Sequence, residues 1–218
     1  MKITLLCSDP NHPVNGYLLR WIAEHEIEHE ISLVRSKKEL SGGQILFLIS
    51  CSEIISSIDR ASYKATLVLH ASDLPQGRGW SPHIWQIVSG AEQVVLSLLE
   101  AEDAVDSGRL WHQIKFLVPK HALWNEINEQ LFSTELELVD FAVQQFESVT
   151  PVSQRTDIEP TYFPKRKPAD SRIEPYASIA SQFDQIRVCD PVRFPAHFEL
   201  HGNQYKLTLE KIEGVEGK

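Results

Sequence analysis

The sequence predicts an α/β fold, with a doubly wound, mostly parallel, Rossmann-like sheet and a small C-terminal extension of a helix and a β-hairpin. Short apolar runs alternate with segments of helical period through the first half of the chain, which is the β-α-β succession of such sheets. The run QILFLIS at 44–50 is continuously apolar, as in strands that are buried on both faces of a parallel sheet.

The expected elements follow from these patterns in chain order. Strands are expected at 2–7, 30–34, 44–50, 66–70, 93–99 and 109–116. Helices are expected at 14–25, after Ser81 as N-cap with Pro82 in the first turn, at 121–148 and at 176–187, with a short helix or turn at 53–61. A β-hairpin is expected around Gly202 and Asn203.

Composition excludes several classes of function. The chain has 218 residues, 42% of them apolar, which is enough for a sizeable core, and a net charge of −9, which disfavours nucleic acid as a partner. Its three cysteines, Cys7, Cys51 and Cys189, have neither disulfide nor metal-site spacing, so a reducing compartment is favoured. No apolar run approaches the ~20 residues of a membrane span. We expect a cytoplasmic protein without membrane contact, and the sequence leaves open whether it forms a homodimer.

The stretch from Leu67 to Trp85, LVLHASDLPQGRGWSPHIW, is the strongest candidate for a functional site. It reads as a strand that ends at His70, then a loop rich in Pro and Gly, then a helix that starts at Pro82. Open α/β sheets bind ligands at the carboxyl ends of their strands, where such loops lie. His70 is therefore the first candidate for a functional side chain.

These residues resemble the formyltransferases that use N10-formyltetrahydrofolate, among them methionyl-tRNA formyltransferases and sugar N-formyltransferases. The family pattern is Asn-x-His-x-Ser-Leu-Leu-Pro, and the residues that match it are His70, Ser72, Leu74 and Pro75. Val68 stands at the position of the family Asn, and Asp73 replaces a Leu. Asp106-Ser107-Gly108 resembles a second family motif, and the segment 162–198 resembles the end of the catalytic domain. The resemblance implies the formyltransferase fold, with a catalytic core at 1–150 and a segment at 151–218 that completes the acceptor site.

The resemblance also implies roles for the site residues. His70 would be the catalytic proton donor that stabilises the oxyanion formed when an amine attacks the formyl carbon, and Asp106 would orient its imidazole and help to take the amine proton. Contacts to the folate cosubstrate are implied for two further sets of residues. These are the strand end Phe47, Leu48, Ile49 and Ser50, largely through the main chain, and the loop residues Leu74, Pro75, Arg78, Gly79, Glu102 and Asp103. We expect these segments to leave adjacent strand ends of the sheet.

The acceptor implied by the resemblance is a nucleotide-linked amino sugar, used in the biosynthesis of surface glycans. The loop LPQGRGWSPHIW is similar to the branch that acts on UDP-linked 4-amino-4,6-dideoxyhexoses. The candidate acceptor contacts are Ser72, Trp80, Tyr162, Lys165, Arg166 and Phe194. For Lys165 and Arg166 a solvated charged loop is an equal alternative, and the three aromatic side chains are also explained by packing.

Two other interpretations remain open. Val68 can neither donate nor accept a hydrogen bond, so the chain could be a catalytically lapsed homologue that still binds folate or a nucleotide sugar. The run from His25 to His29, HEIEH, satisfies the H-E-x-x-H pattern of zinc hydrolases. It falls at the end of a helix directly before a strand, and no third ligand follows at a familiar spacing. We therefore expect no metal.

Overall fold

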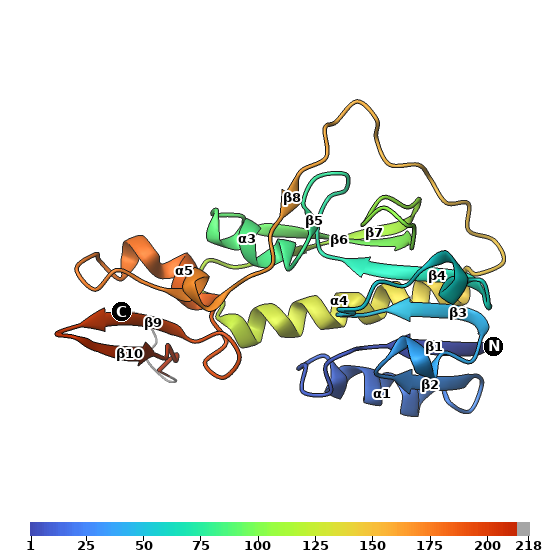
Figure 1. Ribbon diagram of the computed structural model, residues 1–218, viewed down its shortest axis with the longest axis horizontal. Coiled ribbons are helices and arrows are strands. Elements are labelled where there is room, and N and C mark those ends of the chain that lie inside the picture. The colour runs from blue at the N-terminus through green and yellow to red at the C-terminus, as the bar shows by residue number, and fades with distance from the viewer. Residues whose placement is uncertain (213–218) are drawn as a thin grey trace.

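The computed structural model describes residues 1–212 and is built on a six-stranded sheet in the order β2-β1-β3-β4-β6-β7 (Figure 1). Its strands are β1 (Lys2–Leu6), β2 (Glu30–Val34), β3 (Gly43–Leu48), β4 (Tyr63–His70), β6 (Gln93–Glu100) and β7 (Leu110–Leu117). The first four strands run parallel to one another, whereas β6 is antiparallel to β4 and β7 is antiparallel to β6. The predicted α/β fold with a mostly parallel sheet is confirmed.

The strand order places a change of direction between β1 and β3. The chain passes outward from β1 to β2 through α1 (Asn15–His25), and then outward on the other side from β3 to β4 through α2 (Ser57–Arg60). Crossovers between parallel strands are right-handed, so these two connections lie on opposite faces of the sheet. The carboxyl ends of β3 and β4 are neighbours as a result, and β4 delivers His70 to that edge.

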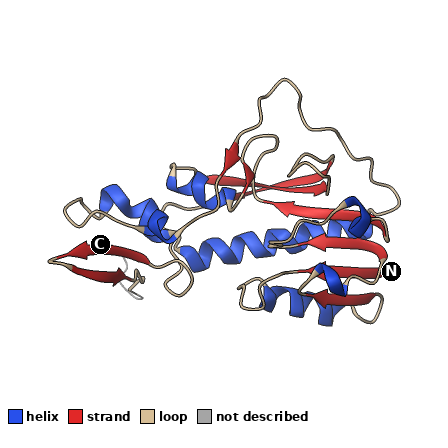
Figure 2. Ribbon diagram, viewed as in Figure 1, coloured by secondary structure: helices blue, strands red, loops and turns tan. Residues whose placement is uncertain are grey.

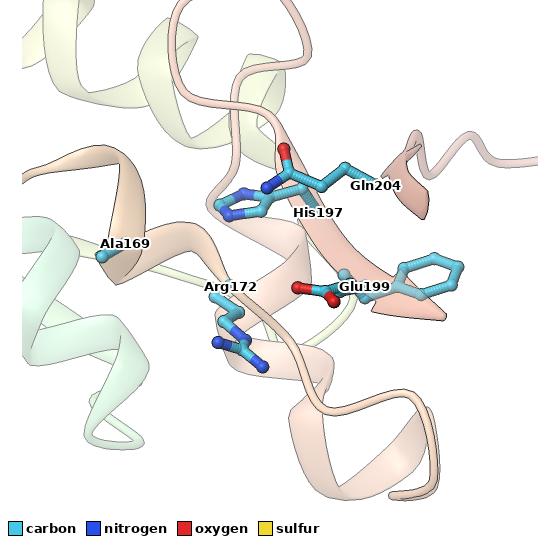
Figure 3. Close-up of a pocket in the computed structure, with 6 residues that line it drawn as sticks. Ala169, Arg172, His197, Glu199 and Gln204 are labelled. Atoms are coloured by element: carbon cyan, nitrogen blue, oxygen red, sulfur yellow. The ribbon is translucent and has the colours of Figure 1, made fainter. Parts of the chain in front are cut away.

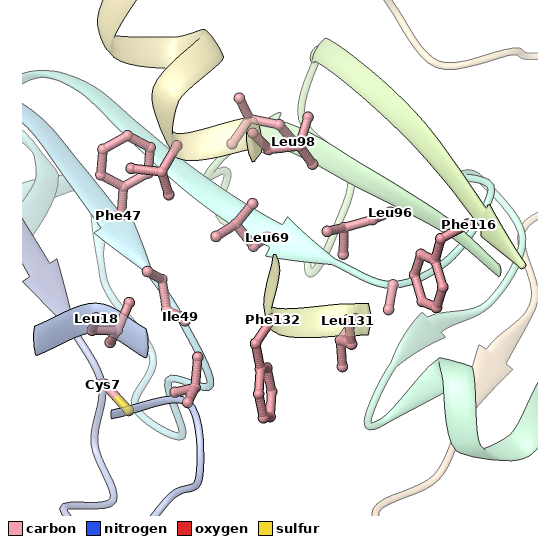
Figure 4. Packing of buried hydrophobic residues seen from close by; sticks show 14 of the residues in the cluster. Cys7, Leu18, Phe47, Ile49, Leu69, Leu96, Leu98, Phe116, Leu131 and Phe132 are labelled. Atoms are coloured by element: carbon pink, nitrogen blue, oxygen red, sulfur yellow. The ribbon is translucent and has the colours of Figure 1, made fainter. Parts of the chain in front are cut away.

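Two helices cover one face of the sheet. Long α4 (Trp124–Gln144) packs beside α1, and their apolar side chains meet the strands in one continuous core (Figure 4). Leu18 of α1, Leu131 of α4 and Phe47 of β3 are among its buried members. The opposite face has a smaller cluster built on Leu6, Leu46 and Leu48, covered by the segment around Ile55 that precedes α2. The segment 51–62 connects β3 to β4, and the segment 101–109 connects β6 to β7. The second segment starts beside β4, where the Ala101 N–H donates to the Thr66 carbonyl.

The C-terminal extension leaves the end of α4 as a long loop that leads to β8 (Tyr162–Phe163), which pairs in parallel with β5 (Arg78–Gly79) in a separate two-stranded sheet (Figure 2). The expected hairpin is present as β9 (Ala196–Leu200) and β10 (Asn203–Leu207). Helix α3 (Pro82–Val88) belongs to the core and follows β5. The extension contains the short helices Pro168–Ser171, Ala180–Gln182 and α5 (Phe183–Arg187), which lie between β8 and β9 in the chain. The division at residue 150 stays a prediction, and residues 213–218 of the predicted extension lie outside the described chain.

One helix is shorter than predicted, and the predicted N-cap of α3 is present but differs in its geometry. The helix expected at 176–187 is present only from Ala180 onward, because the Ser178 hydroxyl accepts the N–H of Ser181 and the Ser178 carbonyl accepts the Ser181 hydroxyl. Such side-chain bonds to the main chain compete with helix formation. Ser81 precedes α3 as expected but makes no capping hydrogen bond, since its main chain has a left-handed conformation with φ of 46°.

Among residues 1–212, none of the helices has the length and apolar character that crossing a membrane requires.

One buried carboxyl group makes a prediction about stability. Glu135 on α4 is 7% exposed and has a carboxyl oxygen without a hydrogen-bond partner, and burial raises its pKa from 4.5 to about 8. Between these two pH values the group is protonated in the folded protein and ionised in the unfolded chain. Burial of Glu135 therefore costs no ionisation free energy below pH 4.5, and the free energy of unfolding falls as the pH rises from 4.5 towards 8.

Glu135→Gln should raise the melting temperature at pH 7.5 and leave it nearly unchanged at pH 4. A difference on the order of a few kcal/mol in unfolding free energy is expected at the higher pH. The control is Glu137→Gln, two positions along the same helix, where the side chain is exposed. Equal effects at both pH values, or equal effects of both substitutions, would contradict the assignment.

Candidate active site

His70 is the last residue of β4, and its ring is held between two oxygen atoms from other segments. The residue is 6% exposed. Its Nε2 atom lies 2.8 Å from the carbonyl oxygen of Gly77, in the loop that follows the strand. Its Nδ1 atom lies 3.6 Å from Oδ2 of Asp106. The structure thus brings together the two residues that the sequence proposed as a catalytic pair, which are 36 positions apart.

Asp106 reaches His70 by a path that differs from the expectation. The expectation was that its loop would leave the same edge of the sheet as the His70 loop, but β6 runs antiparallel to β4 and ends level with Leu67. The loop starts there, with the Ala101 N–H bonded to the Thr66 carbonyl at 2.8 Å, and folds back along the sheet. At Gly108 a Cβ atom would overlap the carbonyl of Glu100, so the return requires glycine in the Asp-Ser-Gly motif.

The carboxylate of Asp106 is fixed by a second contact. Its Oδ2 atom accepts a hydrogen bond from the Gly79 N–H at 2.8 Å, and its side chain is 9% exposed. Asp106 itself has a left-handed main chain, with φ of 51°. Both nitrogens of the His70 ring therefore face oxygen atoms. The Gly77 carbonyl can only accept, so Nε2 carries the hydrogen in this contact and is the donor available to a developing oxyanion.

Val68 lies two residues before His70 on the same strand, so both side chains point to the same face of the sheet. It packs against the smaller apolar cluster of Leu6, Leu46 and Leu48. An Asn at this position would project its amide from beside that cluster towards the His70 ring.

The residues proposed for folate lie around this pair. Phe47 and Leu48 are buried in β3, and the chain leaves the sheet at Ile49 and Ser50, where Ser50 is exposed with φ of 49°. Leu74 and Pro75 are buried in the loop after β4, whereas Glu102 and Asp103 are exposed on the Asp106 loop. Asp103 forms an ion pair with Arg60 at 2.8 Å, which gives it a structural partner.

The residues proposed for the acceptor fall into two groups. Trp80 and Tyr162 are exposed on β5 and β8 or directly beside them, where Lys165 lies 4.6 Å from the Trp80 ring and Arg78 lies 6.0 Å from the Tyr162 ring. Arg166 instead lies 5.5 Å from the Phe194 ring and donates to the hydroxyl of Ser171. Ser72 is 1% exposed, and its hydroxyl has no hydrogen-bond partner.

Two buried imidazoles, His83 and His12, have strongly lowered pKa values. His83 on α3 has a buried Nδ1 atom without a partner, and burial, helped by the charges of His70, Arg166 and His12, lowers its pKa to about 3. Burial together with Arg193 lowers the pKa of His12 to about 4. These two imidazoles are therefore neutral near pH 7. We predicted a role for neither imidazole, because His83 lies within the stretch from Leu67 to Trp85 but outside the positions of the family pattern, and His12 belongs to no motif.

His25 and His29 do not form a site with each other. Helix α1 ends at His25, so His29 lies beyond the helical face that the H-E-x-x-H pattern requires. The His25 ring contacts the Trp21 carbonyl and Asp140, whereas the His29 ring contacts the amino group of Met1. In residues 1–212 there is no group of three or more His, Cys, Asp or Glu side chains placed to hold a metal ion.

A cavity of about 230 Å³ lies in the C-terminal extension, apart from His70 (Figure 3). It is lined by Ala169, Arg172, His197, Phe198, Glu199 and Gln204. None of the residues proposed for catalysis, folate or acceptor is among them.

Comparison with known proteins finds similarity to formyltransferases in both sequence and structure. No family model matches the chain. Over 141 residues it is 32% identical to a methionyl-tRNA formyltransferase of Sulfurovum sp. (strain NBC37-1), a match that covers 65% of this chain and 45% of that relative. The chain thus spans less than half the length of this curated relative.

Solved structures share the fold along nearly the whole chain. A methionyl-tRNA formyltransferase from Clostridium thermocellum superposes with a TM-score of 0.83 at 19% identity, covering 99% of this chain and 95% of that one. A sugar N-formyltransferase from Shewanella superposes with a TM-score of 0.71 at 14% identity, covering 98% and 99% of the two chains. HypX from Aquifex aeolicus in complex with tetrahydrofolic acid superposes with a TM-score of 0.74 at 19% identity, covering 94% of this chain and 36% of that one. The chain has the formyltransferase fold, and its predicted resemblance to the formyltransferase family is confirmed.

Metal dependence can be tested without an activity assay. Because His25 and His29 are engaged by different partners, neither Zn²⁺ nor EDTA should change the melting temperature, since a ligand that binds the folded state raises it. The measurement is thermal unfolding with and without each reagent. A rise with Zn²⁺ that disappears in His25→Ala would show that a metal site exists there.

Proposed function

We propose that the protein is an N-formyltransferase that moves the formyl group of N10-formyltetrahydrofolate to the amino group of a nucleotide-linked amino sugar. The observation that carries the proposal is the buried contact between His70 and Asp106, formed by two residues in register with the family motifs. The matched relatives and solved structures, all formyltransferases by name apart from HypX, support this reaction.

The geometry suggests how the two side chains divide the work. Asp106 faces Nδ1 of His70, which leaves Nε2 as the nitrogen for the substrate. Nε2 donates to the Gly77 carbonyl, so a formyl oxygen that takes this proton has to replace that carbonyl. As the amine attacks the formyl carbon, the Nε2–H group stabilises the oxyanion and the carboxylate accepts the proton that the amine loses. The tetrahedral intermediate then collapses: the bond between the formyl carbon and N10 breaks, and N10 takes up a proton as tetrahydrofolate leaves.

Charge guides the choice of acceptor. Methionyl-tRNA is the substrate in the names of the curated relatives, but a net charge of −9 is unfavourable for a surface that must bind many phosphates. A nucleotide-linked sugar carries only a few. Lys165 beside the exposed Trp80 and Arg78 beside the exposed Tyr162 offer cations and aromatic faces of the kind that bind a nucleotide.

The acceptor can be identified by incubating the protein with N10-formyltetrahydrofolate and a panel of nucleotide-linked amino sugars, UDP-linked 4-amino-4,6-dideoxyhexoses included. Formylation is detected as the mass added to the acceptor. Methionyl-tRNA belongs in the same panel, because its formylation in preference to every sugar would overturn the proposed acceptor class. No transfer to any acceptor would reject the proposed reaction.

A second candidate is a lapsed homologue that binds folate or a nucleotide sugar without transferring the formyl group. Two observations favour it: Val68 lacks the amide of the family Asn, and the Nε2 atom of His70 is already bonded within the protein. Loss of one oxyanion donor typically costs ~10²–10³ in rate. Binding without turnover, measured by calorimetry with tetrahydrofolate, would support this candidate over the enzyme.

The catalytic pair makes the first kinetic prediction. His70→Asn should lower turnover by ~10³ or more, and Asp106→Asn by ~10²–10⁴, because each removes a positioned acid–base group. The double substitution should cost little more than the worse single one, since the two side chains act as a unit. Additive losses in kcat, measured by mass on the best acceptor, would mean that they act separately.

Val68→Asn separates a working site from a lapsed one. If other groups already stabilise the oxyanion, the new amide should bring no gain in turnover and should lower the melting temperature, because it is placed beside an apolar cluster. Val68→Thr, which nearly preserves the side-chain shape, controls for a polar group at this position. If the wild-type turnover is very low and Val68→Asn raises it, the site has lost its oxyanion donor and has not replaced it.

A further inference from the structure

The loop that joins α4 to β8 crosses the outside of the active site (Figure 1). We name residues 150–164 the strap. It is anchored at one end by the pairing of Val152 with Leu110 at the start of β7, and at the other by the pairing of β8 with β5. Between these anchors most of its side chains are exposed, and Gln154 is one of the few that is half-buried.

The amide of Gln154 makes three hydrogen bonds to two different segments of the site. Its Nε2 atom donates to the carbonyl of Asp106 at 2.8 Å and to the carbonyl of Gly108 at 2.9 Å. Its Oε1 atom accepts from Nη2 of Arg78 at 2.7 Å. One side chain thus joins the Asp106 loop to the strand that follows the His70 loop, and it uses both donors and the acceptor of its amide.

A second strap residue holds the other partner of His70. The hydroxyl of Thr161 accepts the N–H of Gly77 at 2.8 Å, and the Thr161 carbonyl accepts the N–H of Arg78 at 2.9 Å. The carbonyl of the same Gly77 accepts from Nε2 of His70. The strap therefore contacts the peptide unit that supplies one oxygen beside the imidazole and the main chain of Asp106, whose side chain supplies the other.

We infer that the strap is the positioning device of the active site, with Gln154 as the residue that sets the carboxylate of Asp106 against His70. The inference rests on the proposed function, because it assigns the two positioned groups to the reaction. The conformation of Asp106 requires stabilisation by contacts from outside its loop, because its main chain is left-handed and the loop has turned back from an antiparallel strand. The two hydrogen bonds from Gln154 fix that loop at the residue itself and two residues beyond.

Gln154→Glu is the sharpest test, because the shape is kept while the donor becomes an oxygen that faces two carbonyls. The contact to Arg78 is retained through the other carboxylate oxygen. With N10-formyltetrahydrofolate and a UDP-linked 4-amino-4,6-dideoxyhexose, we expect kcat to fall by ~10²-fold with little change in KM, the cost typical of a displacement of about 1 Å in a catalytic group. Gln154→Ala should also lower kcat.

The control is Arg155→Ala in the same part of the strap. The Arg155 side chain is 66% exposed and pairs with its near neighbour Asp157, so its removal should leave kcat unchanged. A substitution that merely loosens the fold would lower the melting temperature and leave kcat of the folded enzyme as it was. That outcome for Gln154→Glu would overturn the inference.

A readout without substrate keeps this test separate from the proposed reaction. The ring ¹⁵N resonances of His70, assigned by their loss in His70→Asn, report what each nitrogen contacts. Gln154→Glu should move the Nδ1 resonance, which faces Asp106, and Arg155→Ala should not. Absence of formyl transfer in the wild type would reject the proposed function alone, whereas an unmoved Nδ1 resonance in Gln154→Glu would reject the positioning role alone.

Discussion

The site depends on one buried imidazole whose Nε2 atom is hydrogen-bonded to one oxygen and whose Nδ1 atom faces another, and neither oxygen belongs to its own strand. β4 places the His70 ring, but the carbonyl of Gly77 and the carboxylate of Asp106 come from two loops. A buried polar group that loses its partner costs about 1–3 kcal/mol. The folded state therefore requires both loops to hold their conformations together. The strap supplies this, because Thr161 binds the peptide of Gly77 and Gln154 binds the peptide of Asp106.

The strand directions explain why a strap is needed. In a fully parallel sheet every loop at the carboxyl edge starts beside its neighbours, so the side chains meet without a detour. Here β6 is antiparallel to β4, and the Asp106 loop begins level with Leu67 and has to travel back. The return uses a glycine at the closest approach to Glu100 and a left-handed residue at Asp106. Neither feature fixes the loop against the sheet, and the hydrogen bonds from Gln154 do.

The parts that could be predicted from the sequence are those set by neighbours along the chain. The apolar run at 44–50 and the Pro82 start of α3 were expected within a residue or two of where they lie, because burial and turn chemistry act locally. Gln154 could not be found this way: its partner Asp106 is 48 positions away, and the surrounding QRTDIEP has no periodicity or motif. His83 lies within the stretch from Leu67 to Trp85, but it is not a position of the family pattern, and its neighbour Arg166 comes from the distant C-terminal extension. The motif residues His70 and Asp106 were found through the family resemblance, and the direction of β6 was not, since an apolar run has the same pattern in either direction.

The distribution of unfavourable features bears on whether the site works. Backbone strain and unsatisfied polar atoms persist only where the surrounding structure enforces them, and they gather where function requires them. Asp106 has φ of 51°, and Ser72 and His83 have buried polar atoms without partners, all close to the His70 loop. An unpartnered hydroxyl and an unpartnered imidazole nitrogen would each gain a hydrogen bond from a polar substrate. A chain that had only its fold to maintain would be more stable with Ala at 72 and Gly at 106, so these costs favour a site that binds a polar ligand, which both an active enzyme and a binding homologue would have.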